Sequence, residues 1–194
     1  LTKLRQICFD PRLHYEDYKA GSAKLDTCME LVHGALDGGH RILLFSQFTG
    51  MLDIIGKRLA KEDIAFLKLT GASSKESRAK MVAQFQAGEV PVFLISLKAG
   101  GVGLNLTAAD VVIHYDPWWN VAAQDQATDR AHRIGQQHTV TVYKLIAKDT
   151  IEERIMQMQE SKRDLVNSVL GGDGISSALF TREDVLALLG GDGR

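Results

Sequence analysis

Residues 92–120, VFLISLKAGGVGLNLTAADVVIHYDPWWN, contain two short apolar runs on either side of a glycine-rich segment. Each run, VFLIS (92–96) and VVIHY (111–115), is continuously apolar, which is typical of a strand buried on both faces of its sheet. We therefore expect this stretch to supply two buried strands and a loop with unusual backbone freedom between them.

The segments around this stretch alternate between strand-like and helix-like patterns. Apolar residues recur at helical spacing over 22–37 and 49–61; a capping box from Ser73 to Glu76 opens a helix that Gly88 ends; and Asn120 caps a helix towards Arg133. The other strand-like runs are RILLFS (41–46), AFLKLT (65–70) and TVTVYKLI (139–146). This alternation predicts an α/β fold, a parallel sheet with helices on both faces.

Beyond the last strand, the pattern predicts a C-terminal helical extension. Asp149 and Glu152 form a capping pattern that starts a long helix to about Leu170. GGDG (171–174) indicates a flexible joint, and Thr181 caps a short helix over 182–189. The long helix would bury its apolar stripe of Ile151, Ile155, Met158 and Leu165.

Composition limits the kinds of protein that the chain can be. The chain has 194 residues and a formal net charge of -1, so any nucleic-acid site must be a local patch of Lys and Arg. No apolar run approaches the roughly 18–20 residues of a membrane span, and no secretory signal is visible, so we expect no membrane partner. Cys8 and Cys28 indicate neither a disulfide framework nor a metal site, which favours a reducing compartment. The lack of an initial Met suggests a fragment of a longer chain.

Ligands of parallel α/β sheets bind beyond the carboxyl ends of the strands. We therefore expect the functional residues in the loops after Ser46, Thr70, Ser96 and Tyr115. The glycines at 100, 101 and 103 could let a backbone approach an anion, but on the glycines alone a tight turn is favoured. Neither nucleotide fingerprint is present: the chain has no G-x-G-x-x-G, no G-x-x-x-x-G-K-[ST] and no Asp-Glu dipeptide.

Two further motifs follow the last of these strands. In DPWWN (116–120), one of the two tryptophans of the chain would pack in the core, and the other could contact a ligand or nucleic acid. In DRAHRIGQ (129–136), Arg130 and Arg133 are three residues apart and would share a helix face. They could pair within the helix, with Gln126 and Asp129, or act as arginine fingers on a transferred phosphoryl group. The spacing leaves both hypotheses open.

Four stretches in this order resemble motifs of the Swi/Snf family of DNA-translocating ATPases, which are superfamily-two helicase-like motors. They are LLFSQFTGMLDII, LTGASSKESRAKMVAQFQ, LISLKAGGVGLNLTAADVVIHYDPWWN and QATDRAHRIGQ, and flanking segments extend the similarity from Leu4 to about Val169. The resemblance implies a RecA-like second lobe. Its domains would be a linker or helix over 1–21 from a first lobe, the RecA-like lobe over 22–148, and a brace helix with a short terminal helix over 149–194.

The resemblance also implies the site residues. ATP with Mg²⁺ would be held mainly by the first lobe, with Arg130 and Arg133 as arginine fingers, Gln126 positioning them, and Gly103 and Asn105 near the phosphates and ribose. The second lobe would also grip double-stranded DNA, mainly at its phosphates. The DNA-contacting positions would be Ser46, Gln47, Arg78, Ser96, Lys98, Gly100 and Trp119.

The family resemblance implies a DNA-stimulated ATPase that translocates on duplex DNA and remodels protein–DNA complexes, in a nucleoid or a nucleus, with the isolated fragment inactive. Val121 replaces the usual Pro after WWN, and Asp10 stands where a His is commoner, but neither change removes a group from the nucleotide chemistry. One alternative is a non-catalytic interaction module that keeps the RecA-like fold. Another, which the missing fingerprints disfavour, is a stand-alone nucleotide-binding enzyme.

Overall fold

The computed structural model describes residues 2–99, 104–118, 121–131 and 139–170. Within these residues, five parallel strands form one sheet in the order β2-β3-β1-β4-β5. The strands are β1 (Ile42–Ser46), β2 (Phe66–Leu69), β3 (Val92–Ser96), β4 (Val111–His114) and β5 (Thr141–Lys144). The parallel α/β architecture predicted from the alternating pattern is therefore confirmed.

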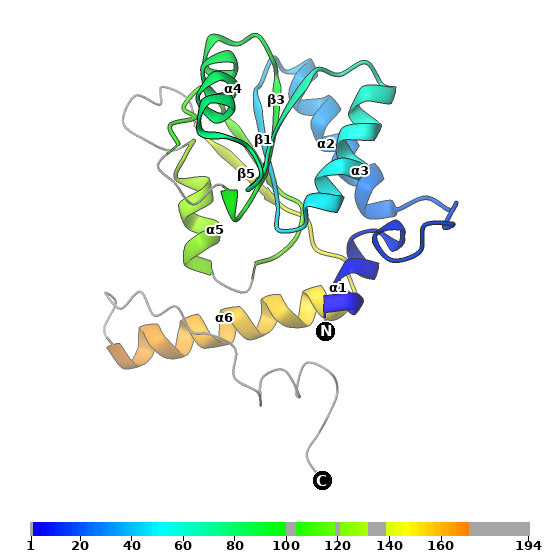
Figure 1. The fold of residues 1–194 in the computed structure, drawn as a ribbon. Coiled ribbons are helices and arrows are strands. Elements are labelled where there is room, and N and C mark those ends of the chain that lie inside the picture. The colour runs from blue at the N-terminus through cyan, green and yellow to red at the C-terminus, as the bar shows by residue number, and fades with distance from the viewer. Residues whose placement is uncertain (1, 100–103, 119–120, 132–138, 171–194) are drawn as a thin grey trace.

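Helices cover both faces of this sheet. Figure 1 shows α2 and α3 on one face and α4 and α5 on the other, while α6 runs below the body of the sheet with its first turns beside α1. The helices are α1 (Thr2–Phe9), α2 (Ala23–Asp37), α3 (Thr49–Lys61), α4 (Lys75–Ala87), α5 (Val121–Thr128) and α6 (Ile151–Leu170), and a 3₁₀ turn spans Pro11–Leu13. None of the described helices has the length and apolarity to cross a membrane.

The central strand β1 explains why its sequence is apolar without alternation. Ile42 and Leu44 pack into the core beneath α2 and α3, whereas Leu43 and Phe45 pack into the core beneath α4. Successive side chains of a strand point to opposite faces, so both sets are buried only because both faces are covered. Each such side chain contributes roughly 1.5–3 kcal/mol through its burial.

Two predicted helix starts are shifted by one residue. Ser74, rather than Ser73, is the N-cap of α4, because its hydroxyl accepts a hydrogen bond from the amide of Ser77 at 3.1 Å. The hydroxyl of Ser73 instead accepts from the amide of Thr70. Both serines can form such local bonds with the backbone, so the sequence alone could not distinguish them.

At α6, the capping pattern predicted at Asp149 and Glu152 is likewise wrong in register. The hydroxyl of Thr150 accepts from the amide of Glu152 at 3.2 Å, and the carboxylate of Glu153 accepts from the amide of Asp149 at 2.8 Å. Ile155 of the expected apolar stripe is fully buried. The predicted joint and short helix after Leu170 lie outside the described residues.

Candidate functional site

An open hollow of about 400 Å³ lies at the carboxyl ends of β1, β2 and β3. It is where the topology of a parallel sheet leads one to look for a ligand. Three of the residues predicted to contact DNA line it, namely Gln47, Ser96 and Lys98. The remaining lining residues are Thr49, Asp53, Lys68, Thr70, Gly71 and Ala72.

The electrostatics of the hollow suit an anion. Lys98 is exposed at its edge. Lys68 also lines it, and its ammonium group is paired with the carboxylate of Asp53. The N-terminus of α3 begins at Thr49 in the same lining and has no side-chain cap. Uncapped amides at a helix N-terminus, with the positive end of the helix dipole, favour a phosphate group.

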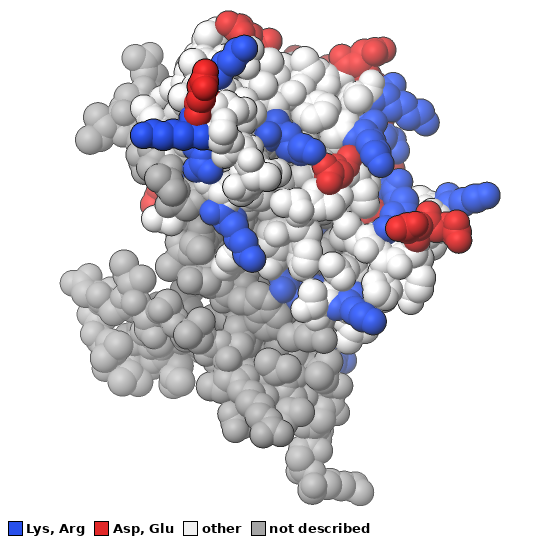
Figure 2. Space-filling view, in the orientation of Figure 1, with Lys and Arg blue, Asp and Glu red and all other residues white. Residues whose placement is uncertain are grey.

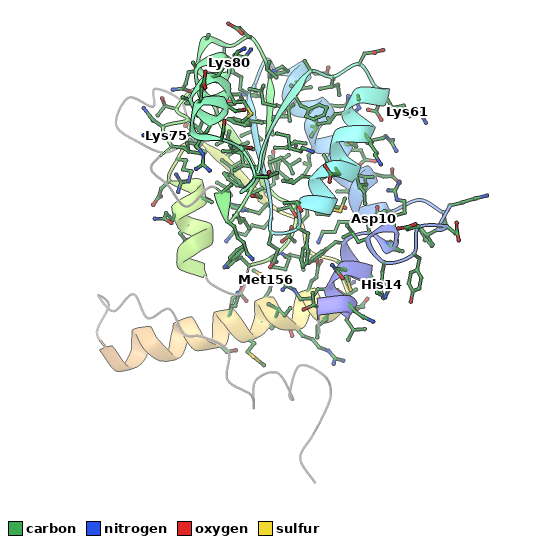
Figure 3. The ribbon with its side chains drawn as sticks, in the orientation of Figure 1. Asp10, His14, Lys61, Lys75, Lys80 and Met156 are labelled. Carbon is green, nitrogen blue, oxygen red and sulfur yellow. The ribbon has the colours of Figure 1, made fainter. Side chains whose placement is uncertain are left out.

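Basic residues outside the hollow do not merge into one surface. Figure 2 shows Lys and Arg side chains interspersed with Asp and Glu over the upper part of the visible face. On α4, Lys75 and Lys80 project to solvent (Figure 3). Arg78 of the same helix instead donates to the carbonyl of Ala99 at 3.2 Å, so its guanidinium supports the loop after β3. On the face that Figure 2 shows, the basic residues therefore form no continuous surface.

Ser46 has a different position from the one expected of a DNA contact. It is fully buried, and its hydroxyl accepts from the amide of Phe48 at 3.1 Å. Its carbonyl accepts from the amide of Leu97, which joins the loop after β1 to the loop after β3. In this structure Ser46 therefore shapes the turn from which Gln47 reaches the hollow, and does not present its own side chain there.

Gln47 is held in place by hydrogen bonds to the loop after β4. Its backbone amide donates to the carboxylate of Asp116 at 3.1 and 3.3 Å, and its side-chain amide donates to the carbonyl of Pro117 at 3.0 Å. Asp116 is buried, and burial raises the pKa of its carboxyl group, although hydrogen bonds from Ser46 and Gln47 oppose this effect. The predicted contacts Gly100 and Trp119 lie outside the described residues.

Arg130, the first arginine of DRAHRIGQ, is enclosed. Its exposed fraction is 1%, between the buried Ala127 and Ala131 in sequence. The regular helix α5 ends at Thr128, after which the amides of Arg130 and Ala131 bond to carbonyls three residues back. The expectation that Arg130 stands on a regular helix face is therefore wrong, since the backbone has already tightened there. Arg133 lies outside the described residues.

The loop after β3 returns to the same region. The amide of Leu106 donates to the carbonyl of Arg130 at 3.1 Å, so the end of this loop and DRAHRIGQ are in direct contact. Asn105, immediately before it, and Gln126 on α5 are both exposed. The structure thus brings the backbone of Asn105 close to that of Arg130, two residues predicted to face the nucleotide. Gly103 lies outside the described residues.

His114 connects α5 to the sheet. One ring nitrogen, Nε2, is 2.9 Å from the hydroxyl of Thr128, and the ring stacks on Phe45. Burial, together with the smaller effect of the nearby positive charge of Lys144, lowers the pKa of His114 to about 4. Within the described residues, Nδ1 has no hydrogen-bond partner, so protonation there would leave a buried N–H unpaired.

Comparison with known proteins gives this arrangement a family. Residues 23–135 match the model of the helicase conserved C-terminal domain, which is more than half of the chain. A Sulfolobus solfataricus SWI2/SNF2 ATPase core in complex with double-stranded DNA superposes with a TM-score of 0.74 at 39% identity, over 87% of this chain and 36% of that one. The chain belongs to the Swi2/Snf2 ATPase family. Within it, the chain is a C-terminal RecA-like lobe.

Relatives from distant organisms agree. An uncharacterised ATP-dependent helicase of Mycoplasma pneumoniae is 43% identical over 97% of this chain and 18% of its own length. The chromatin-remodelling ATPase INO80 of Cryptococcus neoformans is 46% identical over 84% of this chain and 9% of its own length. The Swi2/Snf2 lobe thus spans less than a fifth of these curated relatives.

The names of these relatives imply ATP as cofactor. The described residues of the Swi2/Snf2 lobe offer side chains for only part of an ATP–Mg²⁺ complex. Asn105 and Gln126 offer exposed amides, whereas the positive charge of Arg130 is enclosed. No group of three or more His, Cys, Asp or Glu side chains among the described residues could hold a metal ion. The described residues of this lobe therefore supply donors for an anion and no site for Mg²⁺.

Several residues of the lobe were not found from the sequence. Lys68, Thr49 and Thr70 line the hollow because each lies at or near the end of a strand or the start of a helix. The rule that ligands bind at the carboxyl ends of strands could have found them. The same rule leads to the loop that begins with Asp116, but it does not reveal the hydrogen bond from Gln47 to Asp116, since the two residues are distant in sequence.

Proposed function

We propose that this chain is the second motor lobe of a DNA-dependent ATPase, which translocates on duplex DNA and remodels protein–DNA complexes. The observation that carries the proposal is the open hollow with Lys98 at its edge and the uncapped N-terminus of α3 in its lining. The solved relative with double-stranded DNA and the chromatin-remodelling relatives support the class of substrate.

In this proposal the hollow holds one strand of the duplex at its phosphates. Gln47 and Lys98 contact the backbone, together with Gly100 and Trp119, while the buried Ser46 and Ser96, and Arg78, support the loops that carry them. Contacts of this kind carry little sequence information, which suits a motor that must move over any sequence.

The ATP-facing role belongs to the other loops. Arg130 and Arg133 stabilise negative charge on the transferred phosphoryl group, Gln126 positions them, and Gly103 and Asn105 lie near the phosphates and ribose. ATP, bound with Mg²⁺ mainly by a first lobe, supplies the free energy of phosphoanhydride hydrolysis. Since the sequence contains neither G-x-x-x-x-G-K-[ST] nor an Asp-Glu dipeptide, we propose that this lobe is inactive as an ATPase alone. Closure of the two lobes then steps the protein along DNA inside a nucleoid or nucleus.

The test uses the chain alone and the chain joined to a first lobe from a Swi2/Snf2 relative. The chain alone should bind a duplex weakly, lose affinity as salt rises, and hydrolyse no ATP. The joined protein should show ATP turnover that duplex DNA stimulates. Failure of the chain to bind duplex DNA at low salt would overturn the DNA role. ATP turnover by the chain alone would overturn the proposal that this lobe needs a first lobe for hydrolysis. DNA binding without any turnover in the joined protein would favour an interaction module.

A further inference from the structure

We infer that Arg5 and Gln159, which come from α1 and α6, are positioning residues for the loop after β4. The loop's described residues are Asp116, Pro117 and Trp118. The guanidinium of Arg5 donates to the carbonyl of Pro117 at 3.0 Å, and the side-chain amide of Gln159 donates to the carbonyl of Trp118. Two helices from the two ends of the described chain thus hold consecutive carbonyls of one loop.

Burial of the Arg5 guanidinium costs free energy, because the charge loses its contact with water. Its exposed fraction is 5%, and burial lowers the pKa of its guanidinium, although the negative charges of Asp116 and Glu152 oppose this effect. The guanidinium lies 5.6 Å from the ring centre of Phe9 and 5.9 Å from that of Phe48. A charge taken out of water needs such partners, and packing against these two rings, whose centres are 5.3 Å apart, leaves the planar guanidinium few orientations. The direction of its hydrogen bond to Pro117 is thereby fixed.

The position of Gln159 depends on a buried charge on its own helix, α6. Glu152 is fully buried and pairs with the ammonium group of Lys24 on α2 at 2.5 and 2.6 Å. Glu152 and Gln159 are seven residues apart, so they share one face of α6. Lys24 therefore fixes the first turn of α6, and two turns further along Gln159 reaches the carbonyl of Trp118. Ile155, between them on this face, is fully buried.

The loop held in this way lies between the two predicted sites. On one side, Asp116 and Pro117 accept the hydrogen bonds that hold Gln47 at the hollow. On the other side, the chain continues into α5, which carries Gln126 and leads to Arg130. Displacement of the loop would thus misplace the DNA-facing and nucleotide-facing groups together. Its effect on activity rests on the proposed function, whereas the effect on the loop itself does not.

The tryptophans provide a direct probe, because the chain has two and they are Trp118 and Trp119 of this loop. We would compare Arg5→Met and Gln159→Ala with the wild-type chain by tryptophan emission, far-ultraviolet circular dichroism and thermal unfolding. Lys3→Met and Gln157→Ala are the matched controls, since both residues are exposed on the same two helices. We expect a red-shifted emission in the two variants, unchanged emission in the controls, and partial restoration with Arg5→Lys, which keeps one charged donor.

The joined protein supplies the functional readout. With saturating duplex DNA, Arg5→Met and Gln159→Ala should lower kcat by about ten- to hundredfold with little change in KM for ATP, as a misplaced catalytic group does. Emission that is unchanged in Gln159→Ala, or shifted equally in the controls, would overturn the inference even if Arg5→Met fails to fold. A shifted emission with normal kcat would also overturn the positioning role. If the wild-type chain does not bind DNA while the emission shifts as expected, the proposed function fails and the loop assignment stands.

Discussion

The open hollow and the enclosed region around Arg130 are both built from segments that follow strands, but they differ in access. The hollow has an exposed lysine and about 400 Å³ of open space, whereas Arg130 has an exposed fraction of 1%. A phosphate of DNA can therefore reach the first region in the described structure. Any phosphate that meets Arg130 must first gain access to it. The lobe thus carries an open hollow beside an enclosed arginine, and the role of each can be tested separately.

The largest expected effect falls on the enclosed region. In the joined protein, Arg130→Ala or Arg133→Ala should lower ATP turnover on the order of a thousandfold or more, as loss of an arginine finger does. Duplex binding should stay nearly unchanged, because the hollow is separate. Steady-state turnover and a DNA titration measure the two quantities. Arg130→Lys controls for burial of a charge, and undiminished turnover in both alanine variants would refute the finger assignment.

Acidification should affect the region around Arg130 through His114, which contacts Thr128 at the end of α5. The folded-state pKa of His114 is about 4, below its ordinary value of 6.5. Between these values the unfolded chain binds more protons, so the free energy of unfolding falls as pH falls, by up to about 3 kcal/mol from this group. Its stabilising contribution is complete above pH 6.5 and is lost by about pH 4.

Denaturant unfolding from pH 7 to pH 4 measures this loss. His114→Gln cannot titrate, so the wild type should lose more stability than this variant over the range. The comparison is made between the two proteins because burial raises the pKa of Asp116 and Glu152, which act with the opposite sign. Parallel pH profiles would show that His114 does not stay neutral in the fold.

A smaller effect should separate the hollow from the rest of the basic surface. Lys98→Ala should weaken duplex binding by about fivefold at low salt and reduce the slope of affinity against salt by about one. Lys61→Ala is the matched control: Lys61 is also exposed, but it lies at the far end of α3 from Thr49 (Figure 3). Equal losses in the two variants would indicate a diffuse contact with DNA instead of the hollow.

The smallest effect concerns the support of the hollow. Ser74→Ala removes the N-cap of α4 and should lower the free energy of unfolding by about 0.5–1 kcal/mol. Ser77→Ala, in the same first turn, should cost less, because its hydroxyl does not cap the helix. Chemical denaturation measures both. A larger loss in Ser77→Ala would place the helix start elsewhere.

The parts predicted from the sequence were those set by local pattern. The apolar runs located β1 and β3, and the rule for parallel sheets directed attention to the loops after them, in which the family resemblance placed Gln47 and Lys98. The cap of α4 was one residue off, because Ser73 and Ser74 are both able to cap. Such near-equal local choices are decided by the tertiary structure.

The side-chain placements that the sequence did not predict depend on contacts between distant segments. Arg5 and Pro117 are 112 positions apart, and Lys24 and Glu152 are 128 apart. No periodicity in one chain reveals such pairs. The family resemblance predicted Ser46 as a DNA contact, but Ser46 is buried and its hydroxyl is bound within its own turn. The sequence therefore located the loops, whereas the placement of individual side chains required the fold.

The order of the sheet also has a consequence for synthesis. β1 lies at the centre, between β3 and β4, and both partners come later in the chain. When ILLFS leaves the ribosome, neither of its edges has a partner, and at about 5–20 residues per second the wait until β4 emerges is on the order of several seconds. An unpaired apolar strand is prone to aggregate during that time. The strand at the centre of the finished lobe is therefore open to aggregation until both of its later partners have been made.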